Sequence, residues 1–96
     1  MSDTNANGAI VWHDLTVPDA DKVKDFYKAV VGWTFEPVSM GDYSDFNMIS
    51  ADEETAAGIC HTRGVNSQFP PQWLLYIKVE SINDSLKTCE ELGGKI

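Results

Sequence analysis

Two histidines and two cysteines carry the most versatile chemistry in this sequence of 96 residues. A metal site built on His13 and His61 would need a third ligand, and the sequence suggests none. We therefore expect a structural or surface role for His13. For His61, with Arg63 two residues further on, we expect an exposed strand end rather than an anion site.

The cysteines lie far apart and form no CxxC motif. A nucleophilic Cys60 would need a neighbouring base, and none is clear, so we expect a small buried thiol. Cys89 falls on the apolar face of a predicted helix and is expected in the core. The polar N-terminal residues do not resemble a secretory signal, which favours a cytoplasmic location and reduced thiols, with one disulfide left as the alternative.

Composition limits the classes of protein that the sequence could represent. A chain of this length suits one small domain, and a hydrophobic content of 43% can support a core. The formal net charge is −8, from 15 acidic and 7 basic residues, and an acidic surface repels nucleic acid. No apolar run approaches the ~20 residues of a membrane span. Neither nucleic acid nor membrane is therefore expected as a partner.

Hydrophobic periodicity predicts a strand, a helix and three further strands, followed by a second strand and helix. The first helix should begin after the N-cap Asp19, end at Gly32 and bury the face of Val23, Phe26, Tyr27 and Val30. The predicted strands are residues 10–17, 33–38, 45–50, 55–62 and 73–79, and the second helix follows Ser81 and stops at Gly93 and Gly94. Pro37 indicates an edge strand or a bulge.

The two strand–helix units match at an offset of 62 residues, which maps Val17 onto Val79, Asp19 onto Ser81 and Gly32 onto Gly94. We interpret this as a duplicated module. The expected organisation is a disordered tail (1–9), a first βαβββ module (10–63), a linker (64–72) and the start of a second module (73–96). By the spacing of the first module, the second lacks three strands, so either the sequence continues or another chain completes the sheet. An open strand edge favours pairing, and we expect a homodimer.

Three motifs in this order resemble the vicinal oxygen chelate superfamily, which includes glyoxalase I, bleomycin-resistance proteins and extradiol dioxygenases. They are an Asp followed after six residues by Phe-Tyr (Asp19 to Tyr27), Gly32-Trp33, and Glu-Leu-Gly-Gly (Glu91 to Gly94). The resemblance implies an α+β fold of paired βαβββ modules whose sheets curl into a cleft. In metal-dependent members, the first and last strands of each module hold a divalent metal there.

The resemblance also implies where metal ligands would stand in this sequence. Counting from Asp19 puts the first ligand position at Trp12, and not at the adjacent His13. The second and third positions fall at Gly58 and Leu74, and the fourth lies beyond Ile96. None of the three residues present carries a donor for a divalent ion, so neither a metal nor another cofactor is expected.

The expected site is instead an apolar cleft with a few polar groups, the usual composition of a small-molecule site. Its predicted lining is Trp12, Asp14, Thr16, Gly58, Cys60, Leu74, Tyr76 and Lys78. Asp14 and Lys78 could instead pair with each other or lie at an exposed edge. Trp33 and Phe35 either add an aromatic wall or pack under the helix.

The preferred hypothesis is a superfamily protein without the usual metal ligands that binds a small apolar or aromatic organic molecule. One alternative is an enzyme of the superfamily, a glyoxalase-like lyase or a dioxygenase-like member, that uses a divalent metal. Another is a regulatory or assembly module that binds a partner through its exposed edge. Whether the protein is catalytic stays open at this stage.

Overall fold

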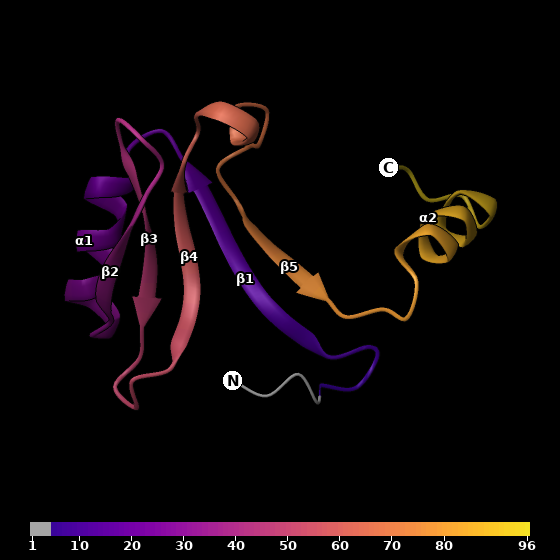
Figure 1. Cartoon of the computed structure of the whole chain (residues 1–96), viewed down its shortest axis with the longest axis horizontal. Helices are drawn as coiled ribbons and strands as arrows, with labels where there is room; N and C mark the ends of the chain where they lie inside the picture. Colours follow the sequence, from indigo (N-terminus) through magenta and orange to yellow (C-terminus); the bar gives the residue numbers. More distant parts are fainter. Residues whose placement is uncertain (1–4) are drawn as a thin grey trace. The chain divides into compact units, whose positions relative to one another are not determined.

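The computed structural model describes residues 5–96, which form a five-stranded mixed sheet and two α-helices of an α+β fold. The strand order is β2-β3-β4-β1-β5 (Figure 1). The elements are β1 (Ile10–Val17), α1 (Ala20–Val31), β2 (Thr34–Ser39), β3 (Ser44–Ile49), β4 (Thr55–His61), the 3-10 turn η1 (Gly64–Asn66), β5 (Trp73–Ile77) and α2 (Ile82–Glu91). These bounds confirm every predicted element to within two residues. No helix in the described range has the length and apolar character needed to cross a membrane.

The chain divides into two compact units, which we describe one at a time. Trp12–Leu75 form the larger unit, and the described residues 5–11 with Tyr76–Ile96 form the smaller one. In the larger unit, β1 pairs with β4 in parallel, while β3 pairs antiparallel with both β2 and β4. This is the βαβββ arrangement that the periodicity predicts. Pro37 lies in β2, an edge strand of the sheet, as expected for a residue without an N–H to donate.

Local signals fix both ends of α1. The Asp19 carboxylate accepts a hydrogen bond from the Lys22 backbone N–H at 3.1 Å, which satisfies one of the unpaired donors of the first turn. At the other end Gly32 has a φ of 81°, a left-handed conformation that costs glycine little because it has no Cβ. The predicted cap and stop are both confirmed.

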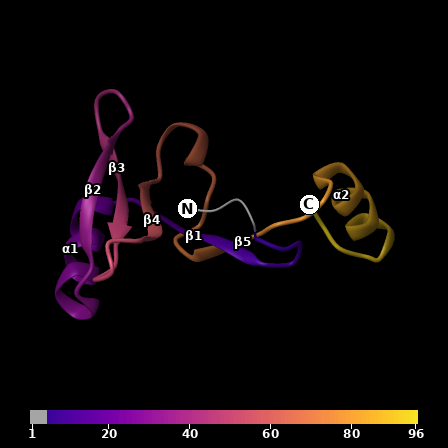
Figure 2. The same cartoon turned by 60° about the horizontal axis from the view of Figure 1, so that its bottom comes forward.

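The core lies between α1 and one face of the sheet. Its buried apolar members are Leu15, Val17, Ala20, Phe46, Met48 and Ile59. Helix α1 packs over β2, β3 and β4, and Figure 2 shows it beside the β2–β3 hairpin from a second direction. Since side chains alternate along a strand, residues 12, 14 and 16 of β1 face away from α1.

The buried face of α1 differs from the expected one. Phe26 and Val30 are exposed, whereas Val23 and Tyr27 pack against the core. Lys24 explains the difference, because its ammonium group lies over the rings of Phe35 and Phe46, 4.6 and 4.9 Å from their centroids. The aliphatic stem and ammonium group of Lys24 cover these aromatic rings. The face of α1 that packs on the sheet therefore includes Lys24 and is not the purely apolar face.

The smaller unit holds α2 and the residues before β1. Ser81 caps α2 through a hydrogen bond from the Asp84 N–H at 3.2 Å, as predicted. Gly8 N–H donates to the Lys78 carbonyl (2.7 Å), and Lys78 N–H donates to the Ala9 carbonyl (2.9 Å). Residues 5–9 of the expected tail thus include backbone partners of Lys78, while residues 1–4 lie outside the described range.

Cys89 corrects an expectation. The sequence predicts Cys89 in the core, but its side chain is exposed. Leu92, directly after α2, is also exposed, at 82% of its surface. The physical reason is that α2 finds no broad apolar surface to cover among the described residues of its own unit. The amphipathic pattern of α2 therefore correctly predicts a helix, but not burial of its apolar side.

Candidate functional site

The face of β1 and β4 that points away from α1 centres on Trp12, Asp14 and Gly58. The Trp12 indole N–H donates a hydrogen bond of 2.7 Å to Asp14 Oδ1. Asp14 lies directly opposite Gly58 in the parallel β1–β4 ladder, and a Cβ at Gly58 would collide with Asp14 Oδ1. The missing side chain of Gly58 thus leaves the room in which the Asp14 carboxylate lies, and this carboxylate fixes the indole.

Thr16 and Cys60 form the next pair along the same face. They are register partners, and Thr16 is buried while Cys60 is half-buried. Burial raises the pKa of the Cys60 thiol to about 12, with further contributions from the negative charges of Asp14 and Asp45 and from a hydrogen bond with Asp45. A thiol held neutral in this way is a poor nucleophile, so the geometry agrees with the expected role as a small structural side chain.

At pH 7.5, we expect iodoacetamide to modify Cys60 at least about tenfold more slowly than the exposed Cys89, because only the thiolate reacts. The pKa of Cys60 lies above its ordinary value of 9.0. The protonated thiol therefore stabilises the folded state fully below pH 9.0, and this stabilisation is lost as the pH rises toward about 12. Peptide mass spectrometry over a pH series measures both rates. Cys89→Ser isolates the Cys60 signal, and equal rates for the two thiols would contradict the assignment.

The remaining three predicted cleft residues come from β5 and the residues after it. Trp73 contacts Tyr27 of α1, so the next residue, Leu74, points to the face opposite α1, where it is half-buried. Tyr76 and Lys78 belong to the smaller unit. There the Lys78 ammonium donates a hydrogen bond of 2.7 Å to the Asn5 carbonyl. The larger unit therefore carries six of the eight predicted lining residues.

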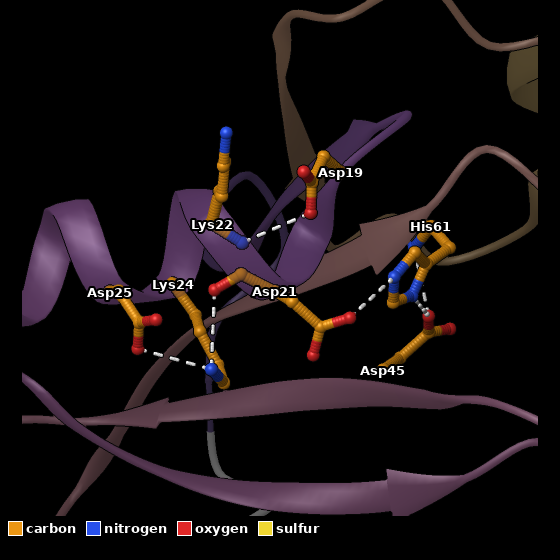
Figure 3. A network of polar contacts seen from close by, with 7 residues as sticks. All are labelled: Asp19, Asp21, Lys22, Lys24, Asp25, Asp45 and His61. Atoms are coloured by element: carbon orange, nitrogen blue, oxygen red, sulfur yellow. Dashed lines mark hydrogen bonds and ion pairs between the residues drawn. The ribbon is translucent and has the colours of Figure 1, made fainter.

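His61 is buried, which corrects the expectation of an exposed strand end. Its side chain lies between two carboxylates, with Nε2 3.4 Å from Asp21 Oδ2 of α1 and Nδ1 3.4 Å from Asp45 Oδ1 of β3 (Figure 3). The Asp45 carboxylate also accepts the His61 backbone N–H at 2.8 Å. Nδ1 makes no hydrogen bond within the described residues, so its contact with Asp45 is electrostatic only.

Two aromatic rings complete the His61 environment, and Arg63 stays outside it. The Tyr43 ring lies edge-on to the imidazole at 5.5 Å, and the Phe46 ring is tilted at 6.3 Å. Arg63 is exposed, stacks on Tyr43 and pairs with Asp42 at 3.2 Å. Sequence reasoning did not single out Asp45. The available signal was its place in a predicted strand, directly before Phe46, where a buried carboxylate needs partners.

His13 lies on the α1 side of the sheet, opposite in phase to Trp12, and it is exposed. A surface role for His13 agrees with the expectation. Trp33 and Phe35 pack on the same side, where Trp33 stacks on Tyr27 (5.5 Å) and Phe35 meets Phe46 edge-on (5.6 Å). Of the two alternatives for this aromatic pair, packing under the helix is the one observed.

The three positions at which the resemblance implies metal ligands do not fit a divalent ion. Trp12 presents an indole, Gly58 has no side chain, and Leu74 is apolar, while the Asp14 carboxylate lies beside the first two of these positions. Across residues 5–96, no group of three or more histidine, cysteine, aspartate or glutamate side chains is arranged to hold a metal. The superfamily's metal chemistry therefore has no matching donor set in this part of the chain.

Fold, motif order and comparison with known proteins define the class of protein. The chain belongs to the glyoxalase and bleomycin-resistance superfamily, also called the vicinal oxygen chelate superfamily. Within it, the model of the family "Bleomycin resistance protein-like N-terminal" matches residues 9–48, which run from the start of β1 into β3.

Two groups of relatives extend the similarity over nearly the whole chain. The anthracycline biosynthesis protein DnrV of Streptomyces peucetius is 27% identical over 103 residues, covering 95% of this chain and 38% of DnrV. The putative glyoxylase CFP32 of Mycobacterium tuberculosis is 23% identical over 94 residues, covering 96% of this chain and 34% of CFP32. The chain thus spans little more than a third of the length of these relatives.

Proposed function

We propose that the chain binds a small, flat organic molecule, apolar or aromatic, on the face of β1 and β4 that points away from α1. The observation that carries the proposal is the indole of Trp12, held by Asp14 next to a residue without a side chain. A fixed aromatic plane suits stacking, and fixing it in advance lowers the entropy lost on binding.

The remaining side chains of this face support binding rather than covalent chemistry. Thr16, Cys60 and Leu74 extend the surface with small or apolar groups, and the Cys60 thiol is neutral at physiological pH. Similarity to a protein named for anthracycline biosynthesis agrees with a polycyclic aromatic ligand. The Asp14 carboxylate would then orient the ligand by accepting a hydrogen bond from it.

We further propose that residues 10–63 act as a first module, that residues 73–96 begin a second, and that a second copy of the chain completes the cleft. The support comes from the smaller unit, where Ile82 of α2 and Leu92, directly after α2, leave apolar surface exposed. Apolar surface of this kind typically marks an interface. Sedimentation at several protein concentrations, with and without ligand, tests this part of the proposal.

Quinizarin, a planar hydroxylated anthraquinone, is a suitable probe for the proposed face. We expect it to quench tryptophan fluorescence, and Trp12→Ala to weaken its binding about tenfold or more, since a buried aromatic contact contributes about 0.5–1.5 kcal/mol beyond its area. Val65→Ala, at an exposed position of η1, is the control and should bind as the parent does. Quinizarin affinity unchanged by Trp12→Ala would overturn the proposal.

The second candidate function is a glyoxalase-like enzyme that uses a divalent metal. The observation in its favour is the similarity to the putative glyoxylase CFP32. Equilibrium dialysis against Zn²⁺ and Ni²⁺ separates the two candidates. Stoichiometric, tight uptake would favour the enzyme, and weak non-stoichiometric uptake would favour the metal-free binding protein.

A further inference from the structure

A hollow of about 370 Å³ lies on the α1 side of the sheet, the opposite side from the proposed cleft. It is lined by His13 of β1, Trp33, Ala56 and Ala57 of β4, and Trp73 of β5, all within the larger unit. Its volume falls in the lower part of the usual range for small-molecule pockets, roughly 300–1,000 Å³.

The hollow arises from a difference in side-chain size. Ala56 and Ala57 can line the hollow together because the β3–β4 register shifts at Ala56, where the usual alternation of side chains is broken. The two alanines form a low floor beside the indoles of Trp33 and Trp73. Helix α1 covers mainly β2, β3 and β4, so it does not fill this space. Neighbouring positions that carry two alanines and two tryptophans thus create a depression that the unit's own helix leaves open.

The aromatic wall is held in place by contacts with α1. The Trp73 indole N–H donates a hydrogen bond of 3.1 Å to the Tyr27 hydroxyl, and the ring of Tyr27 stacks on Trp33 at 5.5 Å. Trp33 and Trp73 also meet edge-on at 6.3 Å. Three rings that fix one another leave a rigid apolar surface, which loses little entropy when a ligand arrives.

The polar character of the hollow narrows the class of ligand. Among the described residues, no Asp, Glu, Lys or Arg lines it, so an ion of either sign would lose hydration without gaining a partner. The net charge of −8 adds long-range repulsion of anions. Of the lining side chains, only the imidazole of His13 can both donate and accept a hydrogen bond, because an indole N–H only donates.

We propose that this hollow is a second binding site, separate from the cleft, for an uncharged phenolic molecule of about two fused rings. The flat ring lies over Ala56 and Ala57 against the indoles, and its hydroxyl group forms a hydrogen bond with His13. This assignment does not depend on the proposed function, because the two sites lie on opposite faces of the sheet.

The three tryptophans allow a residue-specific test on the whole chain. Each indole N–H gives one side-chain signal in a ¹H–¹⁵N spectrum, and replacing each tryptophan by phenylalanine assigns it. On titration with 2-naphthol, we expect the Trp33 and Trp73 signals to shift along one common binding curve. Shifts confined to Trp12, or no shifts at all, would overturn the proposal.

Two variants show whether the shifts report on the hollow itself. Ala56→Leu should fill it and weaken 2-naphthol binding at least tenfold, and His13→Ala should weaken it several-fold through loss of the hydrogen bond. His13 is exposed, so its replacement leaves folding intact even if Ala56→Leu impairs it. Undiminished affinity in His13→Ala, or in a folded Ala56→Leu, would show that the probe binds elsewhere.

Discussion

Replacing Ile59 by alanine is expected to lower the free energy of unfolding by about 2–5 kcal/mol, the largest effect of any substitution considered for this protein. Ile59 is fully buried in β4, where it pairs with Leu15 on one side and Phe46 on the other. Removing its methyl groups leaves a cavity between the sheet and α1 that neighbouring side chains fill only in part. Urea unfolding followed by circular dichroism measures the change.

The matched control for this prediction is Val65→Ala, because Val65 is 91% exposed. It should change stability by no more than about 0.5 kcal/mol. If Ile59→Ala fails to fold, Ile59→Val should still cost about 0.5–1.5 kcal/mol. Equal effects at positions 59 and 65 would mean that the core does not lie where the structure puts it.

Gly58→Ala should have the second largest effect, about 1–3 kcal/mol of lost stability, because the new methyl group collides with the Asp14 carboxylate. Asp14 must move, and its hydrogen bond from the Trp12 indole is then lost or distorted. We therefore expect the variant to show altered tryptophan fluorescence and weaker quinizarin binding as well as a lower unfolding midpoint.

A double-mutant cycle isolates the cause. Removing the carboxylate with Asp14→Ala should make Gly58→Ala much less harmful, so the two substitutions should couple by about 0.5–3 kcal/mol. Strictly additive effects would indicate that Gly58 matters through its backbone and not through the space that it leaves for Asp14.

Short-range signals explain why the sequence predicts so much of the fold. The Asp19 cap, the Gly32 stop and the alternation of β1 depend on residues a few positions apart, and all three are confirmed. The phase of β1 also separates Trp12 from His13, and the structure places them on opposite faces. The resemblance to the superfamily also depends on the order of such local motifs.

Contacts between distant residues account for the errors. The buried environment of His61 depends on Asp21 of α1 and Asp45 of β3. The residues next to position 61 in the sequence do not predict that these two carboxylates lie beside it. The Trp73–Tyr27 hydrogen bond joins residues 46 positions apart, and the hollow beside it depends on that pairing. Periodicity identifies which side of an element is apolar, but not which other element arrives to cover it.

The proline in β2 makes the two edges of the sheet unequal. A strand that added beside β2 would find one donor missing at Pro37, whereas β5 at the opposite edge contains no proline. We therefore expect strand addition beside β5 rather than beside β2, so that two sheets joined through β5, as in the proposed pairing of copies, would not offer an equally good edge for a third. The sheet is suited to finite pairing rather than to fibril formation.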